Sequence, residues 1–433
     1  MLSDRSRPVI EATLPVVAQN VEQIARRFYE HLFAAHPQLL DGTFNRGNQA
    51  RGTQQVALAG SVAVFATTLL RTPEQLPEQL LARIAHKHAS LGVSPAQYDV
   101  VHEHLFAAIG EVLGEAVTPE VAAAWDEVYW LMAYALINTE RGLYSARGVR
   151  PDTVWRPWRV VDKRAETRDV TTFVLERTDD RLVKTSLPGQ YVSVRVGMPD
   201  GVRQPRQYSL TRADDGRHRQ FSVKRVRAGE QDLDGPGVEG PGGAEPEGEV
   251  STLLCERVQV GDELELSLPF GDVVLDDSGR PVVFASAGIG ITPMAGMLSH
   301  LAAAGSHLPV TLLHADADEA SFALREQVLA DVAALPRASA HLWFEDGAGS
   351  SSLVGAPSVA GVRAGLLDLD AVDLPEDALY YLCGPVPFMR AVRGALLERG
   401  VPARDVQYEV FGPDLWAADL AGEPAPGSAA PVG

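Results

Sequence analysis

The chain has 433 residues, more than a single hydrophobic core usually supports, so we expect two or three domains. Apolar residues make up 45% of the chain and charged residues 22%, which is ordinary for a globular protein in water. The formal net charge of -19 argues against nucleic acid or an anionic membrane surface as the main partner.

Cysteine usage and apolar stretches indicate the compartment. Cys255 and Cys383 lie far apart and form no CxxC pattern, so neither a disulfide framework nor a thiolate zinc site is expected. No long apolar stretch follows the first charges after Met1, which predicts that there is no signal peptide. The uncharged stretches 57–70 and 281–299 are too short to span a membrane or are interrupted by Gly and Pro. We therefore expect a soluble, cytoplasmic protein without a membrane span.

The first part of the chain has a helical pattern. Between residues 9 and 145, apolar side chains recur at helical spacing, as in Ile24, Phe28 and Leu32. This pattern predicts an all-α domain over residues 1–148. Helix starts are predicted where a capping residue precedes a proline, at Thr72-Pro73, Ser94-Pro95 and Thr118-Pro119.

Short strand patterns follow over residues 152–276, for example Thr171–Leu175 and Tyr191–Val194, with turn residues between them. They predict a small antiparallel β-barrel. Within this domain, residues 228–249 are rich in Gly, Pro and acidic side chains and contain no Lys or Arg. Such a segment buries little apolar surface, so we expect a disordered surface insertion.

Strand and helix patterns alternate over residues 277–413, which predicts a parallel sheet covered by helices on both faces. Residues 414–433 are rich in Ala, Pro and Gly, and we expect a disordered tail.

Two histidines of the helical domain are candidates for holding a metal cofactor. His86 and His88 are two residues apart, so they cannot share one face of a helix. A haem needs one strong axial ligand, for which neutral imidazole is the usual choice. From the residues alone, a histidine in such a helix is more often a surface or core residue than a ligand.

Lys87-His88, followed by a turn, a proline-started helix and Tyr98, resembles the globin domain of flavohaemoglobins. The resemblance implies that His88 is the proximal ligand of the iron of haem b and that Lys87 is its neighbour in the motif. Tyr98 would hydrogen-bond the other ring nitrogen, and Glu140 would complete the relay. Such partners orient the ring and make it more electron-donating, which favours oxygen activation over storage.

The segments 28–33 and 44–45 resemble the distal and haem-contact segments of the same family. The resemblance places the Tyr29 hydroxyl over iron-bound O2 and Phe44 against the porphyrin. Gln54 and Leu58, one helical turn apart, would belong to the distal helix. Periodicity alone favours ordinary core filling for Tyr29, Phe44 and Leu58.

Two motifs of the barrel resemble the flavin-binding motifs of the ferredoxin-reductase superfamily: Pro188-Gly189-Gln190-Tyr191 and Arg206-Gln207-Tyr208-Ser209. An arginine at this position can pair with a pyrophosphate, the tyrosine can cover the isoalloxazine, and the serine can reach its polar edge. The FAD-binding residues that the resemblance implies are Tyr191, Arg206, Gln207, Tyr208, Ser209 and, for further phosphate contacts, Ser251 and Thr252.

A glycine motif follows a predicted strand in the last domain and begins a helix: Gly288-Ile289-Gly290-Ile291-Thr292-Pro293. Its glycines allow backbone amides to approach a pyrophosphate at the helix N-terminus. Because Pro293 stands in place of a third glycine, the motif resembles the nicotinamide lobe of reductases and not a Rossmann dehydrogenase.

Two later segments complete this resemblance. Cys383, Gly384 and Pro385 would flank the nicotinamide, although Cys383 is equally a small buried hydrophobe. The terminal motif is implied to place Phe411 on the flavin and Glu409 between flavin and haem; its residues are Glu409, Val410, Phe411, Gly412 and Pro413. His314-Ala315-Asp316 lacks an evident basic site for a 2′-phosphate, which favours NADH.

The resemblance extends over residues 1–413, apart from the insertion. By it the chain is identified as a member of the flavohaemoglobins: an all-α globin domain, then a ferredoxin-reductase-like module with a β-barrel FAD domain and an α/β nicotinamide-binding domain. It implies a monomeric nitric oxide dioxygenase in which NAD(P)H reduces FAD, electrons pass to haem, and haem-bound O2 oxidises NO to nitrate. O2, NO and NAD(P)H are the expected partners.

Two alternatives remain open at this point. The first is a haem-linked NAD(P)H reductase of hydroperoxides or other acceptors. The second is an O2 or NO sensor in which the reductase resets the haem. No signalling output domain is visible in the sequence, which argues against a sensor.

Overall fold

The structure is a computed structural model of the chain, and it describes residues 1–44, 53–72, 74–179, 183–227, 248–346 and 352–412. The chain divides into two compact units. The first consists of Met1–Trp155 with Arg195–Arg206, and the second of Arg156–Val194 with Gln207–Gly412.

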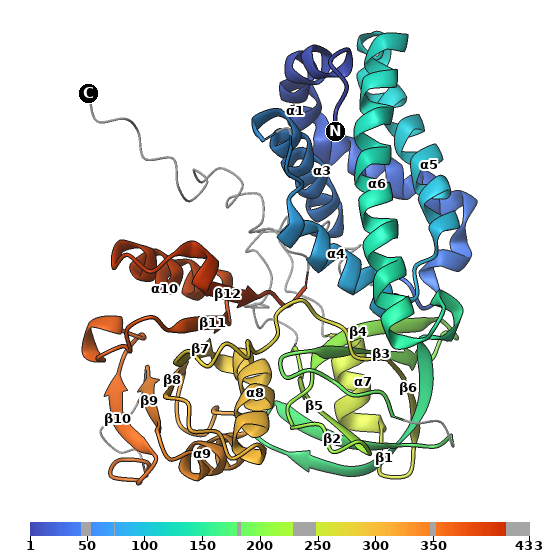
Figure 1. Cartoon of the computed structure of the whole chain (residues 1–433). Helices are drawn as coiled ribbons and strands as arrows, with labels where there is room; N and C mark the ends of the chain where they lie inside the picture. Colours follow the sequence, from blue (N-terminus) through green and yellow to red (C-terminus); the bar gives the residue numbers. More distant parts are fainter. Residues whose placement is uncertain (45–52, 73, 180–182, 228–247, 347–351, 413–433) are drawn as a thin grey trace, which may run out of the picture. The chain divides into compact units, whose positions relative to one another are not determined.

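Long helices build the first unit (Figure 1). Short 3-10 turns, η1 (Pro37–Leu40), η2 (Gly114–Ala116) and η3 (Pro151–Thr153), connect or follow them. This all-α architecture is the one that the apolar spacing predicts. The helices are α1 (Ser6–Ala35), α3 (Thr53–Arg71), α4 (Glu78–Leu91), α5 (Pro95–Leu113) and α6 (Pro119–Arg147).

Two of the three predicted helix starts are confirmed. Helix α5 begins after Ser94, whose backbone N–H donates to Oε1 of Gln97 at 2.8 Å, as in a capping box. Helix α6 begins after Thr118, whose Oγ1 accepts from the N–H of Val121 at 3.3 Å.

The third predicted start, at Thr72-Pro73, is wrong. Thr72 instead completes the last turn of α3, because its N–H donates to the carbonyl of Thr68 at 2.8 Å. The next helix, α4, begins only at Glu78. A capping residue before a proline therefore ended one helix here and did not start another.

The apolar faces of the helices meet in one core. Ile24, Phe28 and Leu32 of α1 pack in it with Phe65 of α3 and Val128 of α6. Tyr29 of α1 and Tyr98 of α5 belong to the same buried cluster. Their hydroxyl groups therefore need hydrogen-bond partners inside the protein.

The strands after the helical segment form a six-stranded antiparallel sheet (Figure 1). Their order in the sheet is β4-β3-β6-β1-β2-β5. Just beyond β4, Leu210 bridges Phe221 of β5, and the N–H of Thr211 donates to the carbonyl of Gln220 at 2.9 Å. These bonds close the sheet into the predicted barrel. The strands are β1 (Trp155–Ala165), β2 (Val170–Arg177), β3 (Tyr191–Gly197), β4 (Arg203–Ser209), β5 (His218–Lys224) and β6 (Glu263–Ser267).

The predicted insertion, 228–249, lies outside the described residues except at its end. Glu249 is not part of it, because it begins helix α7 (Glu249–Arg257). This helix is anchored by Val250 and Leu254, which are 1% and 0% exposed. The predicted tail, 414–433, lies entirely outside the described residues.

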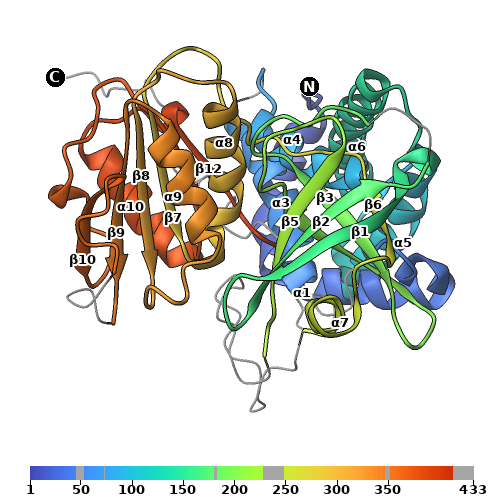
Figure 2. The ribbon, with the colours of Figure 1, turned by 90° about the horizontal axis from the view of Figure 1, so that it is seen from below.

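The α/β lobe contains a parallel sheet in the order β10-β9-β8-β7-β11-β12. Helices α8 (Ile291–Ala303) and α9 (Arg325–Ala334) cover one face, and α10 (Val386–Glu398) covers the other (Figure 2). This is the predicted arrangement of a sheet between two helical layers. The strands are β7 (Val282–Ala287), β8 (Val310–Asp316), β9 (Ala338–Phe344), β10 (Val359–Ala364), β11 (Leu379–Cys383) and β12 (Val406–Glu409).

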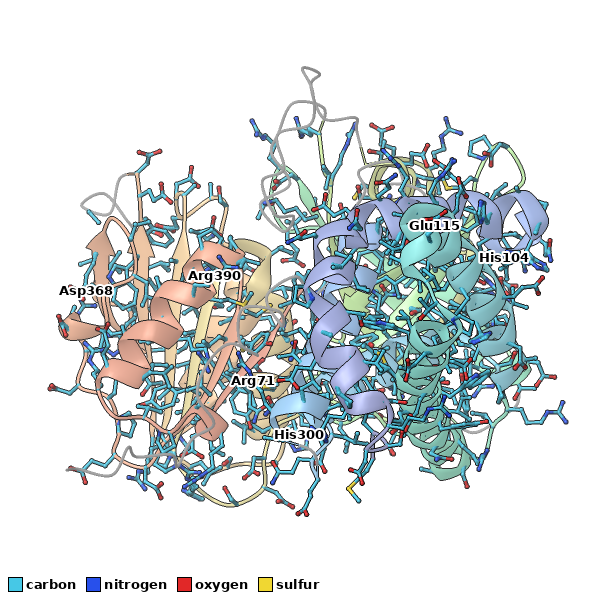
Figure 3. All side chains as sticks on the ribbon, turned by 90° about the horizontal axis from the view of Figure 1, so that it is seen from above. Arg71, His104, Glu115, His300, Asp368 and Arg390 are labelled. Carbon is cyan, nitrogen blue, oxygen red and sulfur yellow. The ribbon has the colours of Figure 1, made fainter. Side chains whose placement is uncertain are left out.

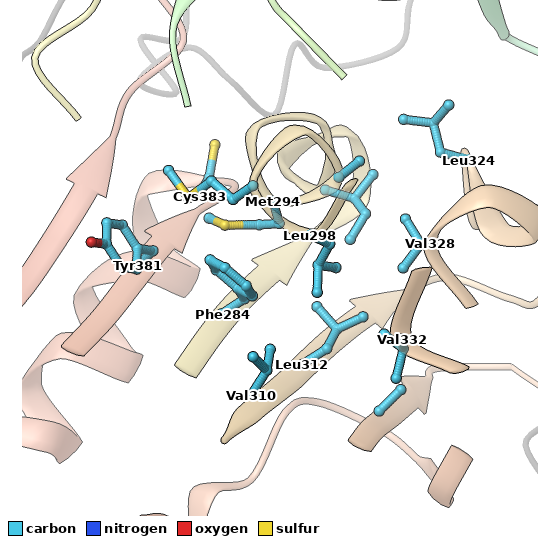
Figure 4. Close-up of a cluster of buried hydrophobic side chains, with 14 of the residues drawn as sticks. Phe284, Met294, Leu298, Val310, Leu312, Leu324, Val328, Val332, Tyr381 and Cys383 are labelled. Atoms are coloured by element: carbon cyan, nitrogen blue, oxygen red, sulfur yellow. The ribbon is translucent and has the colours of Figure 1, made fainter. Parts of the chain in front are cut away.

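The lobe is held together by apolar side chains between α8, α9 and the sheet. Figure 4 shows Phe284 and Leu312 of the sheet facing Met294 and Leu298 of α8, with Val328 of α9 beside them. Each of these side chains is at most 1% exposed. Burying these apolar side chains stabilises the lobe by about 25 cal/mol for each Å² of apolar surface removed from water, and this is the main force that holds α8 on the sheet.

The strand order reverses between β7 and β11, since the chain proceeds from β7 outward to β10 and returns to β11. In such sheets, ligands bind at the carboxyl ends of the strands where the order reverses. The two segments at that point are Gly288–Gly290, after β7, and Gly384, after β11.

Both units carry exposed charged side chains. Figure 3 labels Glu115, Asp368 and Arg390, each of which is exposed. In the described part of the chain, no helix has the length and apolar character needed to cross a membrane.

Candidate functional site

The helical unit brings together three residues from three helices. His88 lies in the last turn of α4, Tyr98 in the first turn of α5 and Glu140 in α6. Nδ1 of His88 is 2.9 Å from Oε1 of Glu140 and 3.0 Å from the hydroxyl of Tyr98. The Tyr98 hydroxyl donates to the same carboxylate oxygen at 2.5 Å.

This arrangement determines the state of the imidazole. An acceptor carboxylate beside Nδ1 places the proton on Nδ1 and leaves the lone pair on Nε2, the tautomer being inferred from this hydrogen bond. Among the described residues, none hydrogen-bonds Nε2 of His88. Burial and the Glu140 carboxylate raise the pKa of Tyr98, so its phenol keeps the proton that it donates. The ring is therefore prepared to bind a metal through Nε2.

Two further tyrosines support these helices. The hydroxyl of Tyr129 donates to the carbonyl of Tyr98 at 2.6 Å. The hydroxyl of Tyr144 donates to the carbonyl of Val93 at 2.8 Å. Both come from α6 and fix the start of α5, so the position of Tyr98 depends on α6 twice. Lys87 precedes His88 on α4, where its carbonyl accepts from Ser90 at 2.8 Å.

A second set of predicted residues lies around Tyr29 of α1. Its ring packs on Phe33 at 5.6 Å and meets Phe44 edge-on at 6.0 Å, both measured between ring centroids. Its hydroxyl hydrogen-bonds the side chain of Gln54, and burial raises the pKa of the phenol. Leu58, one turn after Gln54, packs against the same core.

Phe33 was not assigned to the site from the sequence. It stacks on Tyr29 and lies 5.2 Å from Phe44, so it completes the aromatic wall. Its spacing of four residues from Tyr29 places the two side chains on one face of α1, which is the signal that could have found it.

These two sets fit a haem. The helical unit offers an oriented imidazole, a protonated buried hydroxyl, and aromatic and aliphatic side chains for a flat apolar ring. No group of three or more His, Cys, Asp and Glu side chains in the described residues could hold a bare metal ion. A haem iron needs only one protein ligand from one side.

The predicted flavin motif lies at the end of β4. The ring of Tyr208 stacks on Phe221 at 5.2 Å with an angle of 11° between planes. The Gln207 amide donates to Oγ of Ser193 at 3.0 Å, and Ser209 is buried. Arg206 donates to the carbonyl of the preceding proline at 2.7 Å.

Tyr191, the other predicted flavin residue of the barrel, lies at the start of β3. Its N–H donates to the carbonyl of Phe270 at 2.8 Å, and its carbonyl accepts from the N–H of Phe270 at 3.0 Å. Gly271 follows with φ +133, a conformation in which a side chain would be strained and would press on the Tyr191 ring at 3.3 Å.

The first turn of α7 carries Ser251 and Thr252. Oγ of Ser251 contacts the carbonyl of Gly248 at 3.1 Å and the N–H of Val226 at 3.3 Å. Oγ1 of Thr252 is buried and has no hydrogen-bond partner among the described residues. A buried hydroxyl in this state fits a site that contacts phosphate oxygens, at a helix N-terminus that favours anions.

At the point where the strand order reverses, the two predicted nicotinamide segments meet. A Cβ at Gly290 would lie 2.3 Å from the carbonyl oxygen of Cys383, so only glycine permits this approach. A Cβ at Gly288 would meet nothing within 4 Å, and φ there is +53. The glycine turn is thus open toward solvent on one side, which fits a dinucleotide phosphate.

The rest of the glycine motif is tied to this turn. Oγ1 of Thr292 donates to the carbonyl of Ile289 at 2.9 Å. Ile291, Thr292 and Pro293 begin α8 and are buried. On the β11 side of the point where the strand order reverses, Cys383 is 1% exposed and Gly384 has φ +154. Pro385 precedes α10.

The terminal motif follows β12. Glu409 is paired in register with Cys383, which places it beside the nicotinamide segments. Val410 is buried, Phe411 packs on the core of the lobe, and Gly412 has φ +100. Pro413 lies outside the described residues.

Three families of known proteins match consecutive segments of the chain. The Globin family matches residues 26–136, the oxidoreductase FAD-binding domain matches residues 157–274, and the oxidoreductase NAD-binding domain matches residues 284–394. The solved flavohemoglobin of Malassezia yamatoensis, described with bound FAD and heme, is 36% identical with a TM-score of 0.82. It covers 95% of this chain and 100% of its own.

Curated relatives are similar over almost their whole length. The Flavohemoprotein of Bordetella parapertussis is 41% identical over 425 residues, covering 95% of this chain and 99% of the relative. That of Deinococcus radiodurans is 41% identical over 422 residues, covering 95% and 98%. The chain therefore belongs to the flavohemoprotein family.

Proposed function

We propose that this protein is an NAD(P)H-dependent nitric oxide dioxygenase that detoxifies nitric oxide. In this reaction NAD(P)H electrons, passed through FAD to haem, drive the oxidation of NO by O2 to nitrate. The observation that carries the proposal is the His88–Tyr98–Glu140 set in a chain with FAD- and NAD-binding domains. A solved relative, from Vibrio cholerae, is described as the FAD/NAD-binding domain of nitric oxide dioxygenase and is 34% identical with a TM-score of 0.50. It covers 60% of this chain and 99% of its own.

His88 holds the haem iron through Nε2 in this proposal. Glu140 and Tyr98 keep the proton on Nδ1 and increase the electron density that the imidazole donates. An electron-rich axial ligand favours cleavage and transfer chemistry at oxygen over reversible storage. Lys87, Phe44 and Leu58 complete the cofactor contacts.

Tyr29 and Gln54 act on the opposite side. The Tyr29 hydroxyl stays protonated because burial raises its pKa, so it donates a hydrogen bond to the negative charge that develops on oxygen. Gln54 orients that hydroxyl through the hydrogen bond between their side chains.

The antiparallel barrel binds FAD, and the α/β lobe binds the nicotinamide. Arg206 pairs with the pyrophosphate and Tyr208 covers the isoalloxazine, with the ring held by its stacking on Phe221. The remaining FAD contacts are Tyr191, Gln207, Ser209, Ser251 and Thr252. The nicotinamide contacts are Gly288, Ile289, Gly290, Ile291, Thr292, Pro293, Cys383, Gly384 and Pro385, and the terminal residues Glu409, Val410, Phe411, Gly412 and Pro413 adjoin both.

We further propose that NADH is preferred. Asp316 ends β8, the strand that follows the glycine motif and α8, and in dinucleotide-binding folds an acidic residue that follows the glycine motif recognises a ribose hydroxyl. A 2′-phosphate would be repelled by this carboxylate. The ratio of kcat/KM for NADH and NADPH tests this, and Asp316→Asn is expected to reduce it.

Aerobic, NADH-driven NO consumption by protein loaded with haem and FAD tests the main function. The expected rate is far above that of free haem, with His88→Ala losing both haem and activity. Consumption no faster than free haem, with both cofactors loaded, would overturn the proposal. The proposal includes that the protein is a monomer and that it works in a reducing cytoplasm. Sedimentation of the protein loaded with haem and FAD tests the oligomeric state.

A further inference from the structure

An ion pair connects two distant parts of the first unit. Nε of Arg203 is 3.0 Å from Oδ1 of Asp41, and Nη2 is 2.6 Å from Oδ2. The two planar groups therefore meet through two parallel hydrogen bonds, the strongest arrangement for this pair. The Arg203 backbone N–H also donates to Oδ1 of Asp41 at 2.8 Å.

Backbone bonds reinforce the same contact. The N–H of Gly42 donates to the carbonyl of Arg203 at 2.8 Å, and the Gln204 amide donates to the carbonyl of Leu40 at 3.3 Å. Gly42 has φ +79, and a Cβ there would lie 3.1 Å from Cδ of Arg195. The loop after η1 and the start of β4 are thus joined by side-chain and backbone bonds together. We call this contact, Leu40–Gly42 with Arg203 and Gln204, the latch.

The latch differs from an ordinary surface ion pair. Arg150–Asp152, for example, joins side chains two residues apart, both mostly exposed at 76% and 66%. The latch joins residues 162 apart, and its two side chains are 45% and 36% exposed. Arg203 lowers the pKa of Asp41 to about 2, with Arg195 adding to the effect, so the carboxylate stays ionised at neutral pH.

Each side of the latch leads directly to a residue with a cofactor role in the proposed function. Two residues after Gly42, the ring of Phe44 meets Tyr29 and Phe33. Three residues after Arg203 on the same strand, Arg206 begins the flavin motif. Asp41 follows η1 and Arg203 begins β4, and neither residue is part of a buried core.

We propose that Asp41 and Arg203 are positioning residues that set the rate of electron transfer from flavin to haem, an inference that rests on the proposed function. With the latch closed, the loop that carries Phe44 and the strand that carries Arg206 are held together in the arrangement that transfers electrons. In the transfer, the two-electron-reduced flavin loses one electron and ferric haem iron gains it to become ferrous. Opening the latch reduces the fraction of molecules in the competent arrangement.

Asp41→Asn and Arg203→Lys test this inference in the full-length protein with both cofactors. Asparagine keeps one acceptor oxygen and lysine keeps the charge, so each variant weakens the pair without removing the side chain. Anaerobic mixing with excess NADH under carbon monoxide separates flavin reduction from haem reduction by their absorbance. We expect flavin reduction to be unchanged and haem reduction to slow by about fivefold, the change in population expected for a partly exposed pair.

Hydrogen exchange supplies a readout that does not depend on activity. The Gly42 amide donates to Arg203, so peptides covering residues 37–44 and 195–206 should exchange faster in both variants. Asp152→Asn, which breaks the local pair with Arg150, is the matched control and should change neither exchange nor haem reduction. Combining the two latch variants should slow haem reduction no more than the stronger single variant, because they remove one interaction.

Unchanged haem reduction, with faster exchange in these peptides, would overturn the inference and leave the latch a structural contact. An equal slowing of flavin reduction would also overturn it. Neither measurement uses nitric oxide, so failure of the dioxygenase proposal would appear separately, as absent NO consumption by the unaltered protein.

Discussion

The hydroxyl of Tyr98 lies 2.5 Å from Oε1 of Glu140, and both groups contact Nδ1 of the same imidazole, that of His88. One carboxylate oxygen therefore accepts from a phenol and from a ring N–H at the same time. Glu140 is only 2% exposed, so no bulk water competes for this oxygen. A buried charge with two strong donors orients the ring and increases its basicity.

Glu140→Gln is expected to weaken the axial bond of the haem while keeping the size of the side chain. A neutral amide accepts less strongly from Nδ1–H, so haem affinity should fall by about 10–100-fold. The iron–histidine stretching frequency of the ferrous protein, measured by resonance Raman, should also decrease. Glu120→Gln, on the exposed start of the same helix, is the control and should leave both quantities unchanged.

Tyr29→Phe is expected to keep the haem and to release O2 faster. The substitution removes a donor to a charged ligand, which corresponds to about a tenfold change in dissociation rate. Stopped-flow displacement of O2 by carbon monoxide measures it. Tyr134→Phe removes a hydroxyl from a side chain that is 58% exposed and should have no effect. An unchanged O2 dissociation rate in Tyr29→Phe would contradict the role given to this hydroxyl.

Arg206→Ala should weaken FAD retention with the haem intact. Loss of a charge-assisted contact with the pyrophosphate corresponds to about a tenfold or greater rise in the dissociation constant for FAD. Ultrafiltration followed by flavin fluorescence measures retention, and the Soret absorbance reports the haem. Arg217→Ala removes an exposed arginine of the same barrel that pairs with Glu176, and it should retain FAD normally.

Gly290→Ala should destabilise the α/β lobe and reduce NADH binding. Its Cβ would lie 2.3 Å from the carbonyl oxygen of Cys383, a backbone atom that cannot rotate away. Overpacking of this kind costs about 1–3 kcal/mol of the free energy of unfolding. Gly394→Ala in α10 meets nothing within 4 Å and should instead stabilise the lobe by about 0.5–1 kcal/mol. Thermal unfolding followed by near-UV circular dichroism would distinguish the two.

Asp331 should make the stability of the second unit depend on pH. Burial raises its pKa to about 6, whereas an unfolded aspartate has a pKa of about 3.9. The folded chain therefore binds this proton more tightly, and the free energy of unfolding falls as pH rises from about 4 to about 6. Asp331→Asn removes this penalty, so its melting temperature should exceed that of the unaltered protein by about 2 °C at pH 8.

The sign of this effect is tested at the other end of the range. Below pH 4 the aspartate is protonated in both states, so the advantage of Asp331→Asn should vanish. Asp318→Asn is the opposite control, because hydrogen bonds from Ser321 lower the pKa of Asp318. Its loss should lower the melting temperature at pH 8. An advantage of Asp331→Asn that persists at pH 4 would contradict the assignment.

Much of the fold could be predicted because its signals are local. Apolar spacing indicated the helices of the first unit, and strand patterns with turn residues indicated the barrel. The misplaced helix start at Thr72 shows the limit of such signals. The hydrogen bond of the Thr72 N–H distinguishes the end of α3 from the start of the next helix. It goes to the carbonyl of Thr68, within α3, so Thr72 ends that helix.

The order of the domains, the glycine turn after β7 and the flavin motif could be read from the amino-acid sequence, because each depends on residues close together in the chain. Which side chains meet depends on the packing of the folded protein. Glu140 reaches His88 across 52 residues, Gly290 touches Cys383 across the switch point, and Asp41 meets Arg203 across 162 residues. Such contacts depend on how helices and strands pack, and no pattern of neighbouring residues encodes that packing.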